Sequence, residues 1–187
     1  MLPVIRTPRL LLRPRGREDF EASLAMDLEP GTTRWIEGPW EARETHEAFI
    51  RARIDGPYPD GLGYWVIARK SRPQEFLGWV LLIPEDARGP DVEIGWRMTT
   101  QARGQGFAPE AAANLLSYGF ETVGLGRVIA EIHRENTASR RVAEKIGMQV
   151  DRKVKLENPH SLLYSADLSC AGVPMHRHAS TRSQGAQ

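Results

Sequence analysis

The stretch VEIGWRMTTQARGQGFAPEAAANLLSYGFET, residues 92–122, decides the fold. Its beginning alternates in the manner of a β-strand, which places Glu93 and Arg97 on one face and apolar side chains on the other. Its second half, 106–122, carries alanine, leucine and phenylalanine at spacings of three and four, which predicts a helix with one apolar face. The turn between them, 101–106, therefore joins a strand to the N-terminus of a helix.

A glycine-rich turn in this position is a site for an anion. Unpaired backbone N–H groups point outward from a helix N-terminus, and the helix dipole favours negative charge there. Gly104 and Gly106 let a phosphate approach the backbone closely, and Arg103 adds a charge suited to phosphate. We therefore expect a phosphate or pyrophosphate ligand at this loop.

Two common phosphate motifs do not fit the loop. The Walker motif needs a Gly-Lys-Ser/Thr ending, which is absent here. The dinucleotide fingerprint needs a third glycine three residues after Gly106, but Pro109 occupies that position. The phosphate ligand is thus of another kind.

Strands and helices intermingle along the rest of the chain. Strands are predicted over 9–14, 64–69, 76–83, 92–98, 127–133, 149–155 and 162–168, and helices over 17–26, 39–54, 106–122 and from a cap at Asn136 to Gly147. This order predicts an α+β (α/β three-layer) domain with a mixed, mostly antiparallel sheet of about seven strands and about four flanking helices. Residues 1–168 are expected to form a single domain, and 169–187 a disordered tail.

The composition narrows the function classes. The 187 residues are 41% hydrophobic and 26% charged, the balance of one soluble globular domain. No apolar run has the length of a membrane span or a signal peptide, so we expect no membrane partner and, by default, a cytoplasmic location. Lys and Arg number 25 against 24 acids, without a basic stripe, so nucleic acid is not an expected partner. One cysteine and scattered histidines predict no metal site.

Three motifs in register resemble the GNAT N-acetyltransferase superfamily. The pattern Q-x-x-G-x-G at 101–106 is similar to the acyl-CoA loop of that family, and N-x-x-S at 136–139, followed by AEKIGM at 143–148, is similar to its next motif. The opening TPRLLLRP at 7–14 is similar to the start of its ribosomal-protein (Rim-like) branch. The resemblance covers roughly residues 7–168.

The resemblance implies a GNAT-like twisted sheet that holds acetyl-CoA in a slot between two splayed strands. Backbone groups of Trp96, Arg97 and Met98 are expected to pair with the pantetheine arm like an added strand. Backbone N–H groups of the loop are expected to hold the pyrophosphate, namely those of Arg103, Gly104, Gln105, Gly106, Phe107 and Ala108.

The second motif implies further contacts to the cofactor. Asn136, besides capping its helix, is expected to bind the pantetheine or pyrophosphate region. Ser139 is expected near the thiol, and Arg141 near the nucleotide phosphates.

Glu93 is the candidate general base. It shares a strand face with Gly95, and a carboxylate beside a glycine on the floor of a slot can accept an amine proton, directly or through water. A salt bridge to a neighbouring arginine is the structural alternative. His133 and Glu131 are rival bases.

Ser139 is the candidate general acid for the departing thiolate. Many members of the family carry a tyrosine seven residues after the asparagine, but here that position is Ala143. The Rim-like branch resembles this chain in having a serine at position 139. Tyr164 and Tyr118 are alternative acids.

The resemblance implies transfer of an acetyl group from acetyl-CoA to a primary amine by direct attack in a ternary complex. A protein α-amine, with a pKa of about 7.7–8.0, is far more often neutral near pH 7.5 than a lysine at about 10.4, a difference worth about 3.5 kcal/mol. No strong base constellation is visible, which favours a protein N-terminal amine or a small-molecule amine. The alternative is a non-catalytic acyl-CoA-binding sensor or interaction domain. A monomer or a homodimer is expected.

Overall fold

The computed structural model describes residues 2–85, 89, 91–154 and 156–168. One eight-stranded sheet runs through the molecule in the order β1-β2-β3-β4-β5-β6-β8-β7. The strands are β1 (Ile5–Arg6), β2 (Leu10–Pro14), β3 (Gly63–Arg69), β4 (Gly78–Pro84), β5 (Val92–Met98), β6 (Arg127–His133), β7 (Gln149–Val150) and β8 (Ser161–Asp167). The helices are α1 (Phe20–Asp27), α2 (Arg43–Asp55), α3 (Phe107–Tyr118) and α4 (Thr137–Lys145).

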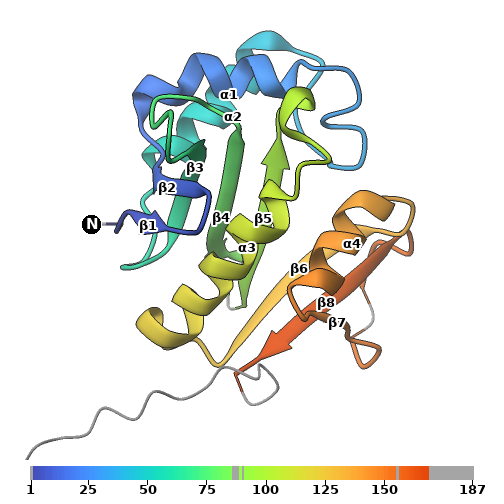
Figure 1. Ribbon diagram of the computed structural model, residues 1–187. Coiled ribbons are helices and arrows are strands. Elements are labelled where there is room, and N and C mark those ends of the chain that lie inside the picture. Colours follow the sequence, from blue (N-terminus) through green and yellow to red (C-terminus); the bar gives the residue numbers. More distant parts are fainter. Residues whose placement is uncertain (1, 86–88, 90, 155, 169–187) are drawn as a thin grey trace, which may run out of the picture.

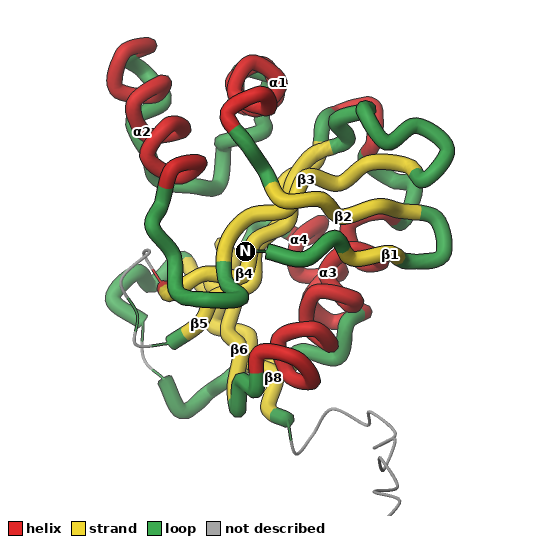
Figure 2. Tube along the Cα trace, turned by 90° about the vertical axis from the view of Figure 1, so that its left-hand side faces the viewer, coloured by secondary structure: helices red, strands yellow, loops and turns green. Residues whose placement is uncertain are grey.

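The helices cover the two faces of the sheet in pairs, with α3 and α4 on one face and α1 and α2 on the other (Figures 1 and 2). The main core lies under α3, where Ala111, Ala112 and Leu115 are fully buried against the sheet. Small alanine side chains let this helix approach the strands closely. On the opposite face, Met26 of α1 packs on aromatic and aliphatic side chains of β3 and β4. The predicted three-layer α+β architecture is therefore confirmed.

None of the helices in the described ranges combines the length and the apolar character needed to cross a membrane.

The sheet opens between β5 and β6. These two strands are parallel and pair only at Glu93 and Ile129, whereas β5 pairs along its whole length with β4, and β6 along its whole length with β8. Beyond that pair, β5 and β6 diverge toward their C-terminal ends (Figure 1). The predicted splay of the strands 92–98 and 127–133 is confirmed.

Three predicted boundaries are wrong for local reasons. The helix expected from Pro39 begins at Arg43, because Ala42 is extended and serves as the N-cap. The helix expected over 17–26 begins with a 3-10 turn and becomes an α-helix at Phe20. The strand expected over 149–155 ends at Val150, since the Asp151 side chain accepts the Lys153 N–H at 2.9 Å and turns the chain.

Other differences lie at the ends of the chain and of α3. The two-residue strand β1 was not predicted, and it pairs with β2 at the sheet edge. The helix expected to reach Thr122 is α-helical to Tyr118 and continues as a π turn over Gly119–Val123. The prediction of a disordered tail over 169–187 lies outside the described residues.

A buried ionic cluster ties α1 and α2 to β5. The Asp27 carboxylate accepts a hydrogen bond from Arg97 Nη1 at 2.5 Å, and its other oxygen lies 3.2 Å from His46 Nε2. All three side chains are at most 8% exposed. The Arg97 guanidinium also lies over the rings of Trp40 and Trp79, at 5.3 and 5.0 Å from their centroids. This cluster fixes the α1–α2 layer against the strand that borders the gap.

Replacing Asp27 with alanine should lower the free energy of unfolding by about 3–5 kcal/mol, because Arg97 would keep a buried charge without a partner. Urea unfolding measures this. Asp55→Ala, which breaks the exposed pair with Arg17, is the matched control and should change stability little. Equal effects of the two substitutions would contradict the role given to the cluster.

Candidate functional site

Strand β5 presents backbone groups to the gap at every second residue. The Thr99 N–H donates to the Leu77 carbonyl at 2.9 Å, which makes Leu77 and Thr99 a hydrogen-bonded pair in register with β4. Because backbone groups alternate sides along an antiparallel strand, those of Trp96 and Met98 face away from β4 and toward the gap. The backbone groups of Trp96 and Met98 thus border the gap, and their contact with a pantetheine arm stays a prediction.

Arg97 lies elsewhere. By the same alternation its N–H and C=O face Trp79 on β4, and its guanidinium is held by Asp27. The backbone groups of Arg97 do not face the gap, so they are not placed to pair with a pantetheine arm there. Arg97 therefore lies on the predicted strand, with its backbone groups toward β4.

The glycine-rich loop lies at the C-terminal end of β5, where the gap is open. Gly104 and Gly106 both have φ of +75°, a left-handed conformation that favours glycine, and Gly106 is the N-cap of α3. Within the described part of the chain, the backbone N–H groups of residues 104–108 have no acceptor. The Arg103 N–H differs, since it donates to the Thr100 carbonyl at 3.3 Å. The loop therefore offers a cradle of N–H groups over 104–108.

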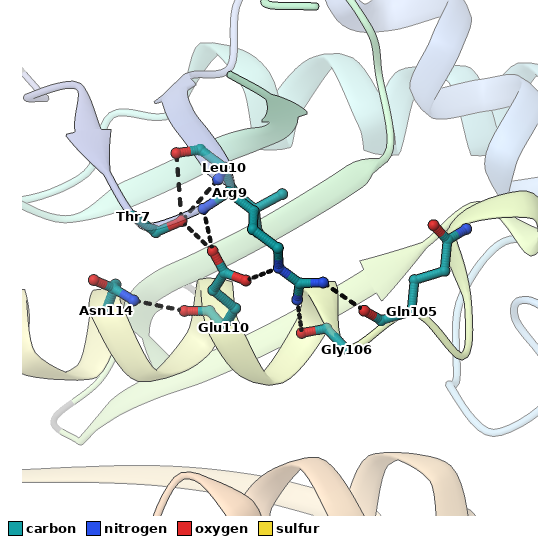
Figure 3. A network of polar contacts seen from close by, with 7 residues as sticks. All are labelled: Thr7, Arg9, Leu10, Gln105, Gly106, Glu110 and Asn114. Atoms are coloured by element: carbon teal, nitrogen blue, oxygen red, sulfur yellow. Dashed lines mark hydrogen bonds and ion pairs between the residues drawn. The ribbon is translucent and has the colours of Figure 1, made fainter. Parts of the chain in front are cut away.

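The carbonyl side of the same loop is held by Arg9 (Figure 3). Its guanidinium donates to the Gln105 carbonyl at 3.0 Å and to the Gly106 carbonyl at 3.1 Å. It also donates from Nε to Glu110 of α3 at 2.6 Å. Sequence reasoning did not assign this role to Arg9, and the only signal was its place in the opening TPRLLLRP motif.

Glu110 stays a carboxylate in this network. Burial acts to raise its pKa, but hydrogen bonds from the Thr7 hydroxyl and from the backbone and side chain of Arg9 outweigh burial and lower the pKa. A negative charge in the first turn of α3 also suits the helix dipole.

Arg103 bridges the end of β5 to the segment between α1 and α2. Its Nε donates to the Met98 carbonyl at 3.2 Å, and its Nη2 donates to the Thr32 hydroxyl at 2.6 Å. Next to it, Glu29 accepts hydrogen bonds from the N–H and the hydroxyl of Thr100. Arg103, which the sequence predicts to bind phosphate, thus lies at the loop, and two of its nitrogens donate to protein oxygens. Sequence reasoning missed Glu29 and Thr32.

Helix α4 brings the second motif to the open end of the gap, directly after β6. The Asn136 side chain accepts the Ser139 N–H at 3.1 Å, which confirms the predicted N-cap. The Ser139 side chain is half-buried, and its hydroxyl has no hydrogen-bond partner among residues 2–85, 89, 91–154 and 156–168. Arg141 is exposed, whereas its neighbour Arg140 is bound to the Tyr164 hydroxyl at 3.1 Å.

The alternative acids have structural partners. The Tyr164 ring is buried, and its hydroxyl accepts from Arg140 and donates to Glu144. The Tyr118 hydroxyl donates to the Gly61 carbonyl at the opposite end of α3 from the loop, and burial raises its pKa. Both tyrosine hydroxyls are therefore bound to other protein groups, whereas the Ser139 hydroxyl has no partner among the described residues.

The candidate bases lie at opposite ends of the gap. Glu93 is at its closed end, at the one pair that joins β5 to β6 in the described chain. His133 ends β6 at the open side, where it stacks on Trp35 at 4.6 Å and its Nδ1 accepts the Glu135 N–H at 3.2 Å. Glu131 is exposed on the intervening part of β6.

The described residues contain no group of three or more histidine, cysteine, aspartate or glutamate side chains arranged to hold a metal ion.

An open strand edge that leads to an N–H cradle at a helix N-terminus suits a strand-like ligand that carries an anion. The chain belongs to the GNAT acetyltransferase family, because the family model described as an acetyltransferase (GNAT) domain matches residues 9–149. The protein is an N-acetyltransferase.

Individual relatives agree with this family. The FsC-acetyl coenzyme A-N(2)-transacetylase of Aspergillus fumigatus is 32% identical over 158 residues, which are 78% of this chain and 65% of that protein, so the chain spans less than two thirds of that relative. The uncharacterized protein YkkB of Bacillus subtilis is 32% identical over 157 residues, 82% of this chain and 90% of that protein. A crystal structure of an acetyltransferase from Agrobacterium tumefaciens has a TM-score of 0.76 and 28% identity, covering 89% of this chain and 95% of that one.

Asn136→Ala should lower the free energy of unfolding by about 1 kcal/mol, since the Ser139 N–H loses its acceptor at the start of α4. Asn136→Ser keeps a capping side chain and should unfold close to the unsubstituted protein in urea. If the alanine and serine variants unfold at the same urea concentration, the cap does not stabilise α4. The serine variant also separates capping from any contact of the Asn136 amide with the cofactor.

Proposed function

We propose that this enzyme transfers an acetyl group from acetyl-CoA to a primary amine by direct attack in a ternary complex. The observation that carries the proposal is the single β5–β6 pair, Glu93 with Ile129, which leaves a strand edge that leads to the N–H cradle at 104–108. The acceptor is a protein N-terminal amine or a small-molecule amine. Acetyl-CoA is the acyl donor, and no metal takes part in the proposal.

The donor fits the residues that border the gap. The cradle at 104–108 suits a pyrophosphate, because its N–H groups lie at a helix N-terminus without another acceptor in the described chain. The backbone groups of Trp96 and Met98 suit the amides of a pantetheine arm, in the way that a strand accepts a neighbour. Asn136 and Arg141 stay proposed contacts at the α4 side.

Glu93 is the base that this arrangement favours. An arm that starts from phosphates at the loop and pairs along β5 points its far end toward the closed end of the gap, where Glu93 lies. His133 stacks on Trp35, and its Nδ1 already accepts the Glu135 N–H. Glu93 therefore takes the proton that the amine releases as its nitrogen bonds to the thioester carbonyl carbon.

Ser139 is the acid that we propose for the leaving group. Its hydroxyl donates a proton to the thiolate as the carbon–sulfur bond breaks, and a backbone N–H on the gap-facing edge of β5 polarises the thioester carbonyl. The support for Ser139 is its unpaired hydroxyl on the first turn of α4, against the paired hydroxyls of Tyr164 and Tyr118.

The acceptor class rests on two likenesses. The opening motif resembles the Rim-like branch, which supports a protein N-terminus. The relative from Aspergillus fumigatus carries acetyl coenzyme A and an N2 position in its name, which supports a small-molecule amine. A protein N-terminal amine has a lower pKa than a lysine side chain, in keeping with a site that has one candidate carboxylate at the closed end of the gap.

Calorimetric titration with acetyl-CoA should show binding that Gly104→Glu weakens at least about tenfold, since a carboxylate would enter the anion cradle. A Cβ at Gly104 meets nothing within 4 Å, so the loss would not come from a clash. Gly124→Glu is the matched control, with φ of +82° and equally open space at the far end of α3. Dephospho-CoA, which keeps the pyrophosphate, should still bind. Absence of binding at near-millimolar acetyl-CoA would overturn the proposed function.

Glu93→Gln should lower kcat by about 10²-fold or more with an unchanged affinity for acetyl-CoA, because a neutral amide cannot take the amine proton. Glu131→Gln, on the neighbouring strand, is the control and should leave turnover unchanged. Ser139→Ala should lower kcat without loss of acetyl-CoA binding. The assay follows thiol release with a panel of N-terminal peptides and polyamines. Unchanged turnover in Glu93→Gln would remove Glu93 as the base, and acetyl-CoA binding without turnover of any amine would favour a non-catalytic domain.

A further inference from the structure

Arg9 contacts the phosphate loop from behind, on the side away from the cradle. It precedes β2, and 96 residues of chain separate it from Gln105. Three of its guanidinium nitrogens donate, to the carbonyls of Gln105 and Gly106 and to the carboxylate of Glu110 (Figure 3). The Arg9 side chain is half exposed, so water could satisfy its donors, and burial does not force these hydrogen bonds to protein oxygens.

Peptide geometry connects these carbonyls to the cradle. In a planar trans peptide, the C=O of one residue and the N–H of the next point in opposite directions. Arg9 binds the carbonyls of Gln105 and Gly106 from the side of β2, and the Gly106 carbonyl also accepts the Glu110 N–H at 3.3 Å in the first turn of α3. The N–H groups of Gly106 and Phe107 therefore point the other way, and both belong to the run without an acceptor in the described chain.

Arg9 is itself held in one orientation. Its backbone N–H donates to Glu110 at 2.8 Å, and the Thr7 hydroxyl donates to the same carboxylate oxygen at 2.6 Å. The guanidinium lies over the Phe107 ring, 4.8 Å from its centroid. Arg69 lies over the same ring at 5.2 Å and donates to the Gln105 side chain at 3.4 Å. A planar guanidinium with donors in fixed directions can serve two carbonyls at once, which a lysine ammonium does not reproduce.

The loop needs such support because its glycines are permissive. Gly104 and Gly106 have access to many backbone conformations, and fixing them costs conformational entropy. If that cost is met before the ligand arrives, binding does not have to meet it again. The positive charge of Arg9 close behind the loop also favours an anion in front of it.

We infer that Arg9 is a positioning residue for the donor pyrophosphate: it turns two peptide groups of the loop so that the N–H groups of Gly106 and Phe107 face the phosphates. This inference rests on the proposed function for the identity of the ligand. It assigns a binding role to the Thr7–Arg9–Glu110 network, which the catalytic scheme does not use.

The test compares ligands with and without a pyrophosphate. Arg9→Gln should weaken acetyl-CoA binding at least about tenfold by calorimetry and raise the KM for acetyl-CoA with little change in kcat. S-acetylpantetheine, which lacks the pyrophosphate, should show an unchanged kcat/KM in the same variant. Arg9→Lys should not restore binding. Arg17→Gln, which removes an exposed arginine paired with Asp55, is the control and should behave as the unsubstituted enzyme.

Two results would overturn the inference: acetyl-CoA binding by Arg9→Gln within twofold of the unsubstituted protein, or an equal loss with S-acetylpantetheine, which would show a general structural role. If Arg9→Gln does not fold, Glu110→Gln keeps the arginine but loosens it, and an intermediate loss for acetyl-CoA alone is expected. If the unsubstituted protein does not bind acetyl-CoA, the proposed function fails. Titration with inorganic pyrophosphate then decides the inference, which requires binding that Arg9→Gln weakens.

Discussion

The site depends on one constraint, the pairing of β5 and β6 at a single residue pair. Each strand is held along its whole length by its other neighbour, β4 or β8, so neither is free to close the gap without breaking a complete ladder. Backbone groups of Trp96 and Met98 therefore face a gap instead of a strand. The Met98 carbonyl accepts from Arg103 Nε, and a strand-like arm of a ligand can supply partners for the other backbone groups on this edge.

Three arginines fix the borders of this gap from different directions. Arg97 ties β5 to Asp27 of α1, Arg103 ties the end of β5 to Thr32, and Arg9 ties the glycine-rich loop to the start of β2. Each guanidinium donates hydrogen bonds to protein oxygens. The groups in the described chain that can still bind an anion here are the backbone N–H groups of residues 104–108. The cradle is thus built from main-chain donors that side-chain cations orient, so the loop sequence needs glycine at positions 104 and 106 more than it needs a basic residue.

Features that depend on nearby residues were readable from the chain. The strand 92–98, the start of α3 after Gly106 and the cap at Asn136 follow from alternation, helical spacing and capping, all of which act within a few residues. The wrongly predicted boundaries also arise from interactions between neighbouring residues. The turn at Asp151 ends a strand earlier than predicted, and the extended backbone at Ala42 makes α2 begin later than predicted. Strand β1 was missed because two residues carry no periodicity.

The sequence by itself determined the order of the elements, the glycine turn before α3 and the family resemblance, because these are local patterns. Only the tertiary structure decided that Arg97 turns from the gap toward Asp27, and that Tyr164 is bound between Arg140 and Glu144. It also decided that Arg9 meets a carbonyl 96 residues away. The physical reason is that a guanidinium bonds to whichever oxygen the packing of distant strands and helices brings within reach, and no local spacing encodes that meeting.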